Sequence, residues 1–167
     1  MDEEKTYLFH QTPSDIAAEL IQYVPIEEND ILYEPFKGEG AFYNNFPESN
    51  VKIYTEIKEN LDYKDNNDIY DWVISNPPFR LETNNVRRNA FWVLVDYFTD
   101  RARKGVAFLG NDYCLSTLTP RRLNILKEKG FTVNKIVVCN IKKWRGRYFF
   151  IILEKDRPTD FYNYLLS

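Results

Sequence analysis

The sequence predicts one α/β domain with a mostly parallel, seven-stranded sheet, helices on both faces and an antiparallel strand near the C-terminus. Short apolar runs alternate with segments of helical spacing, which is the pattern of parallel strands joined by helices. Several runs end at an acidic residue, a glycine or a proline, where a strand would give way to a turn. A length of 167 residues without repeats or Gly/Ser linkers fits a single domain over residues 1–167.

Each expected element has its own signal. Thr12 and Pro13 have the pattern of a helix cap followed by a first-turn proline, and Thr119 and Pro120 repeat it. Apolar residues at helical spacing predict helices at residues 13–24, 41–45, about 87–103, and from Thr119 to Gly130. Apolar runs predict strands at residues 30–34, 51–55, 71–75, 105–109, 133–139 and 148–154. The last two strands are expected to pair with each other.

Composition argues against several classes of protein. No stretch approaches the roughly 20 apolar residues that span a bilayer, and the acidic, polar start is unlike a signal peptide. Cys114 and Cys139 lack paired spacing, which favours a reducing, cytoplasmic setting in which both are small buried hydrophobic residues. His10 is the single histidine, and without a His/Cys cluster we expect no metal site.

Charge is divided unevenly along the chain. Residues 1–79 carry five Lys and Arg against 17 Asp and Glu, whereas residues 80–147 carry 15 against five. A basic block within an acidic protein predicts contact with a polyanion. The alternative is ordinary solvated charge on helices.

The first chemical motif lies at residues 30–42, where a strand, an acid, two glycines and a helix start follow in order. Gly38 and Gly40 permit a tight turn and close approach of a ligand, and Glu34 ends the strand that leads into it. GxGxxG is incomplete and no GK[ST] follows, so the pattern favours a nucleoside cofactor without a phosphate. Glu56 ends the next strand, where an acid can hold ribose hydroxyls. The alternatives are a plain strand–turn–helix connection and a surface acid.

The second motif is Asn76-Pro77-Pro78-Phe79, directly after an apolar strand. Two prolines make a rigid turn whose carbonyls are not used by a helix or sheet. The Asn76 side-chain oxygen and the Pro77 carbonyl could accept both N–H groups of an exocyclic base amine, while Phe79 stacks on the base. Such a site would act by positioning and directed polarity. The alternative is a purely structural Pro-Pro turn.

Together these motifs resemble the class I amino-methyltransferases of nucleic acids, in particular small phage or viral adenine-specific DNA methyltransferases of the NPPF type. The resemblance spans residues 11–155 and is carried by residues 11–13, 34–42, 55–57, 62–63 and 76–79. It implies a Rossmann-like domain, the cofactor S-adenosylmethionine, and transfer of a methyl group to the N6 amine of adenine in DNA.

The resemblance also implies individual residue roles. The cofactor-binding residues would be Thr12, Pro13, Glu34, Pro35, Gly38, Gly40, Phe42, Glu56, Ile57, Asp62 and Tyr63. Within this set Glu56 matches the ribose-binding acid, Ile57 the apolar contact to the adenine ring, and Asp62 the acceptor from its amine. Asn76 to Phe79 match the catalytic tetrad.

The basic block contains a second aromatic candidate. Lys142, Lys143, Arg145 and Arg147 surround Trp144, so phosphates could take the charges while Trp144 forms the second wall opposite Phe79 around a flipped base. The alternative places Trp144 in the core. Further phosphate contacts are expected from Arg87, Arg88, Arg121 and Arg122.

One departure from the family leaves other functions open. No large target-recognition domain follows the catalytic motif, so the basic block or a partner subunit would have to read the target, or the substrate would be RNA or single-stranded. A protein glutamine methyltransferase is one rival, because a glutamine amide is chemically similar to a base amine. A non-catalytic subunit of a nucleic-acid-binding complex is the other.

Overall fold

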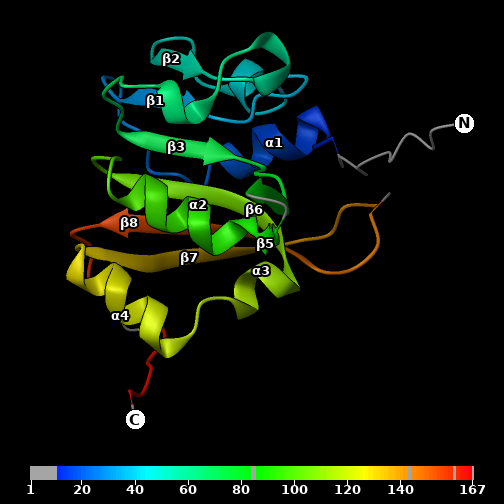
Figure 1. The fold of residues 1–167 in the computed structure, drawn as a ribbon. Helices are drawn as coiled ribbons and strands as arrows, with labels where there is room; N and C mark the ends of the chain where they lie inside the picture. The colour runs from blue at the N-terminus through cyan, green and yellow to red at the C-terminus, as the bar shows by residue number, and fades with distance from the viewer. Residues whose placement is uncertain (1–10, 84–85, 143, 160, 167) are drawn as a thin grey trace, which may run out of the picture.

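The computed structural model describes residues 11–83, 86–142, 144–159 and 161–166, with the side chains of residues 82–89 left out. One six-stranded sheet runs through the molecule in the order β2-β1-β3-β6-β8-β7 (Figure 1). Its strands are β1 (Ile31–Glu34), β2 (Val51–Tyr54), β3 (Trp72–Ser75), β6 (Gly105–Asn111), β7 (Phe131–Cys139) and β8 (Tyr148–Lys155). The α/β architecture and these strand positions confirm the prediction from sequence.

The predicted seventh strand is wrong, because the described part of this sheet has six. The chain between β2 and β3 is polar and forms only two 3-10 turns, η2 (Ile57–Glu59) and η3 (Tyr63–Asp65), so it adds no strand. The sheet therefore ends at β2 on this side.

Strand directions decide which loops meet. Strands β2, β1, β3 and β6 are parallel, whereas β8 is antiparallel to both β6 and β7. Ser75 is paired with Phe108, and Tyr148 with both Asn111 and Cys139. The turn after β3 and the β7–β8 loop (residues 140–147) therefore emerge from the same edge of the sheet, the side of the β3 and β6 arrowheads in Figure 1.

Helices cover both faces, as predicted. Helix α1 (Ser14–Ile21) covers one face, and α2 (Ala90–Thr99) and α4 (Pro120–Glu128) the other (Figure 1). Because side chains alternate along a strand, successive residues enter different cores. Trp72 and Ile74 pack with α1, whereas Val73 between them packs with α2.

Three short elements differ from the sequence prediction. The expected helix at 87–103 is replaced at its start by the hairpin of β4 (Arg80–Thr83) and β5 (Val86–Asn89), so α2 begins at Ala90. An extra helix, α3 (Asp112–Ser116), follows β6 because the Asn111 side chain accepts from the Cys114 backbone N–H. The short helix expected at 41–45 is the 3-10 turn η1 (Tyr43–Asn45).

The two cap-plus-proline patterns have different outcomes. Thr119 caps α4, with its hydroxyl accepting from the Arg122 N–H at 3.4 Å. At α1 the cap position belongs to Pro13, and the Thr12 hydroxyl contacts Asn76 instead. None of the described helices is long and apolar enough to cross a membrane.

Candidate functional site

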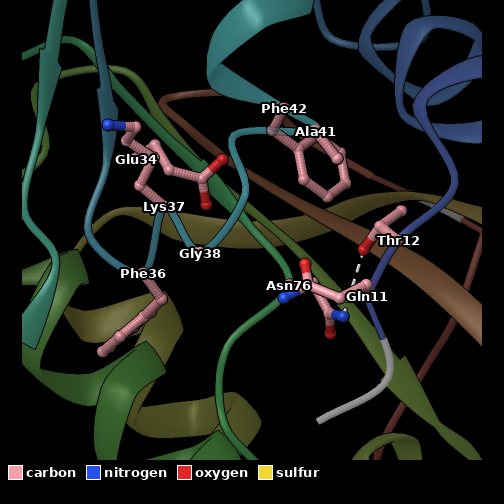
Figure 2. A pocket seen from close by; sticks show the side chains of 9 residues that line it. All are labelled: Gln11, Thr12, Glu34, Phe36, Lys37, Gly38, Ala41, Phe42 and Asn76. Carbon is pink, nitrogen blue, oxygen red and sulfur yellow. Dashed lines mark hydrogen bonds between the residues drawn. The ribbon is translucent and has the colours of Figure 1, made fainter. Parts of the chain in front are cut away.

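A small cavity, partly open to solvent, lies at the edge of the sheet where β1 and β3 end (Figure 2). Its walls come from three places: the turn after β1, the residue after β3, and the segment before α1. The lining residues are Gln11, Thr12, Glu34, Phe36, Lys37, Gly38, Ala41, Phe42 and Asn76. Five of the residues proposed from sequence for cofactor binding or catalysis therefore share one cavity: Thr12, Glu34, Gly38, Phe42 and Asn76.

Glu34 provides a buried carboxylate on this cavity. Its side chain is 1% exposed, and one oxygen accepts a hydrogen bond from the Ser75 hydroxyl. Within the described residues the other oxygen, Oε2, is buried without a hydrogen bond of ordinary geometry. Burial raises the pKa of Glu34 well above its usual value, the Ser75 hydroxyl and the Tyr43 backbone N–H counter this in part, and the charge of Glu56 adds to the rise. A cationic ligand would stabilise the ionised form.

Lys37 lies on the same cavity, but its ammonium group is engaged elsewhere. Lys37 Nζ is 3.3 Å from Glu59 Oε1 and 3.8 Å from the centre of the Tyr54 ring. Burial opposes its charge, but Glu59 and Tyr54 outweigh burial and raise the pKa of Lys37. The lysine is therefore held by Glu59 and not by Glu34, and Figure 2 shows its end turned away from the cavity.

The glycine turn depends on left-handed backbone conformations. Gly38 has a φ of 53° and Gly40 a φ of 87°, backbone angles that residues other than glycine rarely adopt. At Gly40 a Cβ atom would also lie 2.8 Å from the Asn44 side chain. The two glycines therefore fix the curved backbone that forms one wall of the cavity.

Glu56 holds this turn in place. The Gly38 N–H donates to Glu56 Oε2 at 2.6 Å, and the Lys58 N–H donates to Oε1 at 3.1 Å. The carboxylate thus caps η2 and ties it to the glycine turn. Glu56 was proposed from sequence as the ribose-binding acid; the structure places it beside the turn, with both oxygens already accepting backbone hydrogen bonds.

We expect Glu56→Ala to destabilise the protein by about 1–3 kcal/mol, because two N–H groups in a partly buried turn lose a charged acceptor. Urea unfolding would measure the change. Glu56→Gln is the matched control, since its amide oxygen can still accept from one N–H, and it should lose less. Equal unfolding midpoints for the wild type and Glu56→Ala would contradict this role.

Asn76 is the residue that follows β3, and it meets Thr12 across the cavity. Asn76 Nδ2 donates to Thr12 Oγ1 at 3.1 Å, drawn as the dashed line in Figure 2. Thr12 is buried, and Asn76 is half-buried. The amide of the predicted catalytic residue is thus oriented by a hydroxyl from a segment 64 residues earlier in the chain.

The rest of the tetrad lies behind Asn76. Pro77 is buried, and Pro78 and Phe79 are half-buried. The Phe79 ring packs at the margin of both core clusters, and its carbonyl accepts from the Ala90 N–H at 3.2 Å. The proline turn is therefore anchored at the start of α2.

The remaining cofactor candidates are not among the residues that line this cavity. Ile57 is 67% exposed, and the Asp62 side chain accepts from the Lys64 N–H at 2.9 Å. Tyr63 packs edge-on against Phe36 with ring centres 5.2 Å apart, and burial raises the pKa of Tyr63 to about 12. Pro13 caps α1, and the Pro35 carbonyl accepts from the Thr55 hydroxyl.

The basic segment lies in the β7–β8 loop, on the same edge of the sheet as Asn76. Lys142, Arg145 and Arg147 are exposed, and Lys143 lies outside the described residues. Trp144 is half-buried, packs against the α1-side core and meets Tyr148 edge-on at 4.8 Å. Arg87 and Arg88 belong to β5, with side chains outside the described part; Arg121 is exposed and Arg122 half-buried on α4.

Sequence reasoning missed five site residues. Gln11, Phe36, Lys37 and Ala41 line the cavity, and Ser75 holds Glu34. Phe36 and Lys37 lie inside the recognised glycine motif, so their place in it was the available signal. Ser75 is the polar last residue of an otherwise apolar strand, directly before Asn76. Cys114 is buried as predicted and Cys139 is only half-buried; His10 lies outside the described residues.

No family model matches the chain, and no curated protein matches it either. Several solved structures do match the chain. A proposed RNA methyltransferase from Pyrococcus horikoshii is 18% identical with a TM-score of 0.65, over 87% of this chain and 85% of that one. The Mtq2–Trm112 complex of E. cuniculi, which methylates the eRF1 translation termination factor, gives 16% identity and a TM-score of 0.59 over 88% and 98%.

A modification subunit of a proposed type I restriction enzyme from Vibrio vulnificus is 13% identical with a TM-score of 0.63, over 90% of this chain and 45% of that one. Further matches include S-adenosylmethionine-dependent methyltransferases, some with that cofactor or its product bound. The chain has the class I methyltransferase fold. In this fold the C-terminal strand β8 lies beside β6 and runs antiparallel to it.

The residues of this methyltransferase fold fit its usual cofactor. The cavity offers a buried carboxylate oxygen without an ordinary hydrogen bond at Glu34, a glycine turn that admits close approach, and aromatic walls at Phe36 and Phe42. An ammonium or sulfonium group suits such a carboxylate, and a nucleoside ring suits the aromatic walls. Within the described residues no group of three or more His, Cys, Asp and Glu is arranged to hold a metal ion.

Proposed function

We propose that this protein transfers a methyl group from S-adenosylmethionine to the exocyclic amine of a base in nucleic acid, most specifically N6 of adenine in DNA. One observation carries the proposal. Asn76, which begins the Asn-Pro-Pro-Phe turn, lines the same cavity as Glu34 and the glycine turn. An acceptor for an amine and a site suited to a cationic nucleoside therefore adjoin each other.

In this proposal the cofactor supplies an electrophilic methyl group on a sulfonium centre. Glu34 would accept from its ammonium group, Gly38 would allow the backbone to approach it, and the exposed Ile57 would cover the adenine ring. Glu56 acts mainly by holding the Gly38 turn, since its two oxygens accept from Gly38 and Lys58. Asp62 and Tyr63 complete the adenine end.

The catalytic contribution of the chain is positioning. An exocyclic amine is a weak nucleophile because its lone pair is delocalised into the ring. The Asn76 amide oxygen and the Pro77 carbonyl would accept its two N–H groups and turn its lone pair towards the methyl group. The hydrogen bond from Asn76 to Thr12 restrains that amide before substrate binds.

A nucleic acid substrate is favoured by the charge on the catalytic edge. The β7–β8 loop presents exposed Lys142, Arg145 and Arg147 on the side of the sheet where Asn76 lies. Phosphates would take these charges, and a flipped base would stack between Phe79 and Trp144. Both rings are half-buried, so each retains an exposed part. In this scheme a partner subunit could recognise the target sequence, while this chain binds the cofactor and the flipped base.

A protein glutamine methyltransferase is the second candidate function. The Mtq2–Trm112 complex has the same fold and modifies a protein, and a glutamine amide presents the same two N–H groups. The basic loop argues for a polyanion instead. A non-catalytic subunit would need no cofactor affinity, and the cavity at Glu34 argues against it.

Methyl transfer to DNA, RNA and protein, assayed side by side with labelled cofactor, tests the proposal. We expect label in DNA, recovered as N6-methyladenine by nucleoside mass spectrometry. Label in protein alone, recovered as methylglutamine, would replace this function with the second candidate. No cofactor binding in a thermal shift assay would remove both.

We expect the Lys142→Ala/Arg145→Ala double variant to bind DNA about tenfold more weakly near 0.1 M salt. The slope of log affinity against log salt should fall by about 0.9 for each lost phosphate contact. Fluorescence anisotropy with a labelled oligonucleotide measures both. Lys127→Ala, an exposed lysine on α4, is the matched control. An unchanged slope in the double variant would place the nucleic acid elsewhere.

A further inference from the structure

We propose that Ser75 is a positioning residue that links the cofactor-binding carboxylate of Glu34 to the catalytic turn at Asn76, so that cofactor affinity depends on its hydroxyl. This inference rests on the proposed function and deepens it. Ser75 is the last residue of β3 and is covalently joined to Asn76. It also donates a hydrogen bond to Glu34 Oε1. One residue thus connects the end of β1 to the residue that begins the Asn-Pro-Pro-Phe turn.

The buried surroundings of Ser75 restrict its hydroxyl to donating a hydrogen bond to Glu34. Ser75 is 0% exposed, and it is paired in the sheet with Phe108, a core residue. A hydroxyl in such surroundings costs free energy unless it makes a hydrogen bond. An ionised carboxylate only accepts, so the hydroxyl must donate to Glu34 when that group is charged. The hydrogen bond therefore favours the charged form.

The charges around Glu34 leave the Ser75 hydroxyl as an important stabiliser of the ionised carboxylate. Glu56 repels a charge on Glu34, the Tyr43 backbone N–H attracts it, and Lys37 is held by Glu59 and Tyr54. Burial raises the pKa of Glu34, and the Ser75 hydroxyl is the largest factor that lowers it. Without that hydroxyl, the pKa would rise further and a smaller fraction of Glu34 would be ionised to receive a cationic ligand.

The sign of the pH dependence follows from this. Glu34 is neutral below its pKa, so affinity for a cationic ligand should increase as pH rises through that pKa. In Ser75→Ala the same increase should occur at higher pH. In Glu34→Gln, which cannot ionise, this component of the pH dependence should vanish.

Calorimetric titration with S-adenosylmethionine from pH 5 to pH 9 tests the inference on four proteins: wild type, Ser75→Ala, Glu34→Gln and the double variant. We expect Ser75→Ala to bind about tenfold more weakly near neutral pH, with its pH midpoint displaced upwards. In the Glu34→Gln background, Ser75→Ala should cause little further loss, because the group it acts through is no longer ionisable. Ser75→Thr keeps the hydroxyl and should retain the wild-type midpoint. Ser75→Cys has a weaker donor, so its midpoint should lie between those of the wild type and Ser75→Ala.

Two results would overturn the inference. One is an unchanged pH midpoint in Ser75→Ala; the other is an equal loss of affinity with Glu or Gln at position 34, which would show a generic packing effect. A carboxyl carbon NMR titration of the ligand-free protein separates this inference from the proposed function. If the wild type binds no cofactor, the function fails, whereas the Glu34 pKa should still rise in Ser75→Ala. Urea unfolding of each variant identifies any loss of folding.

Discussion

Asn76→Ala should lower kcat for methyl transfer by about 10²–10³-fold, the cost typical of losing one preorganised polar group at a reacting centre. The side chain lines the cavity and leads into a rigid proline turn. Alanine removes the acceptor that would hold the target amine but leaves the carbonyl of Pro77. We therefore expect kcat to fall while the Kd for S-adenosylmethionine changes less than threefold. Single-turnover transfer and calorimetry measure the two quantities.

Asn76→Asp is the matched variant for this prediction. It keeps an oxygen acceptor but replaces the amide with an acid on the same cavity as Glu34. We expect activity between that of the wild type and Asn76→Ala, with a stronger dependence on pH. Near wild-type kcat in Asn76→Ala, with unfolding unchanged, would show that the amine is held by other groups.

Gly105→Ala should destabilise the fold by about 3 kcal/mol or more, because the first residue of β6 has no room for a side chain. A Cβ atom there would lie 2.0 Å from Trp72 Cζ3 and 2.6 Å from the Leu153 carbonyl oxygen. Trp72 is 1% exposed and lies in the α1-side core, so it cannot move without disturbing that core. Urea unfolding of the ligand-free protein measures the loss.

Gly146→Ala provides a contrast in the β7–β8 loop. Apart from its two chain neighbours, no described residue has an atom within 4 Å of a Cβ added there, but Gly146 has a φ of 99°. Only conformational strain opposes the substitution, so we expect a loss of about 1–2 kcal/mol. Equal losses at both glycines would show that the core around Trp72 rearranges at little cost.

The central strands were predicted from sequence because each is largely a compact apolar run. Val106 and Phe108 enter one core and Ala107 and Leu109 the other, so β6 carries no polar side chain before Asn111. A strand buried on both faces has exactly this signature. The start and end of each run therefore marked the strand to within a few residues.

The β4–β5 hairpin could not be found in the same way. Its residues are mostly polar, and it adjoins Phe91, Leu94 and Phe98, whose helical spacing drew the predicted helix back to residue 87. A two-stranded ribbon outside the main sheet shows little of the alternating apolar pattern that predicts a strand. Helix α3 was missed for a related reason, since five residues are too short for a period.

Site residues were predictable where backbone chemistry is unusual. Gly38 and Asn76 belong to turns rich in glycine or proline, and both line the cavity. Ser75 and Thr12 act through hydrogen bonds that span 41 and 64 residues. Such contacts depend on strand order, which one sequence does not specify. Thr12 was expected to cap a helix and, by resemblance, to bind the cofactor, but its contact with Asn76 was not predicted.

The reversed course of β8 shows where this fold can be diversified. Cys139 and Tyr148 are paired in the sheet, so the chain leaves and re-enters the ladder at one place. Extra residues inserted between them would cost little loop entropy and disrupt no strand pair. They would also emerge on the side of Asn76. Residues inserted beyond Ile141 and Trp144, which pack in the α1-side core, would add new surface beside Asn76 without displacing either core.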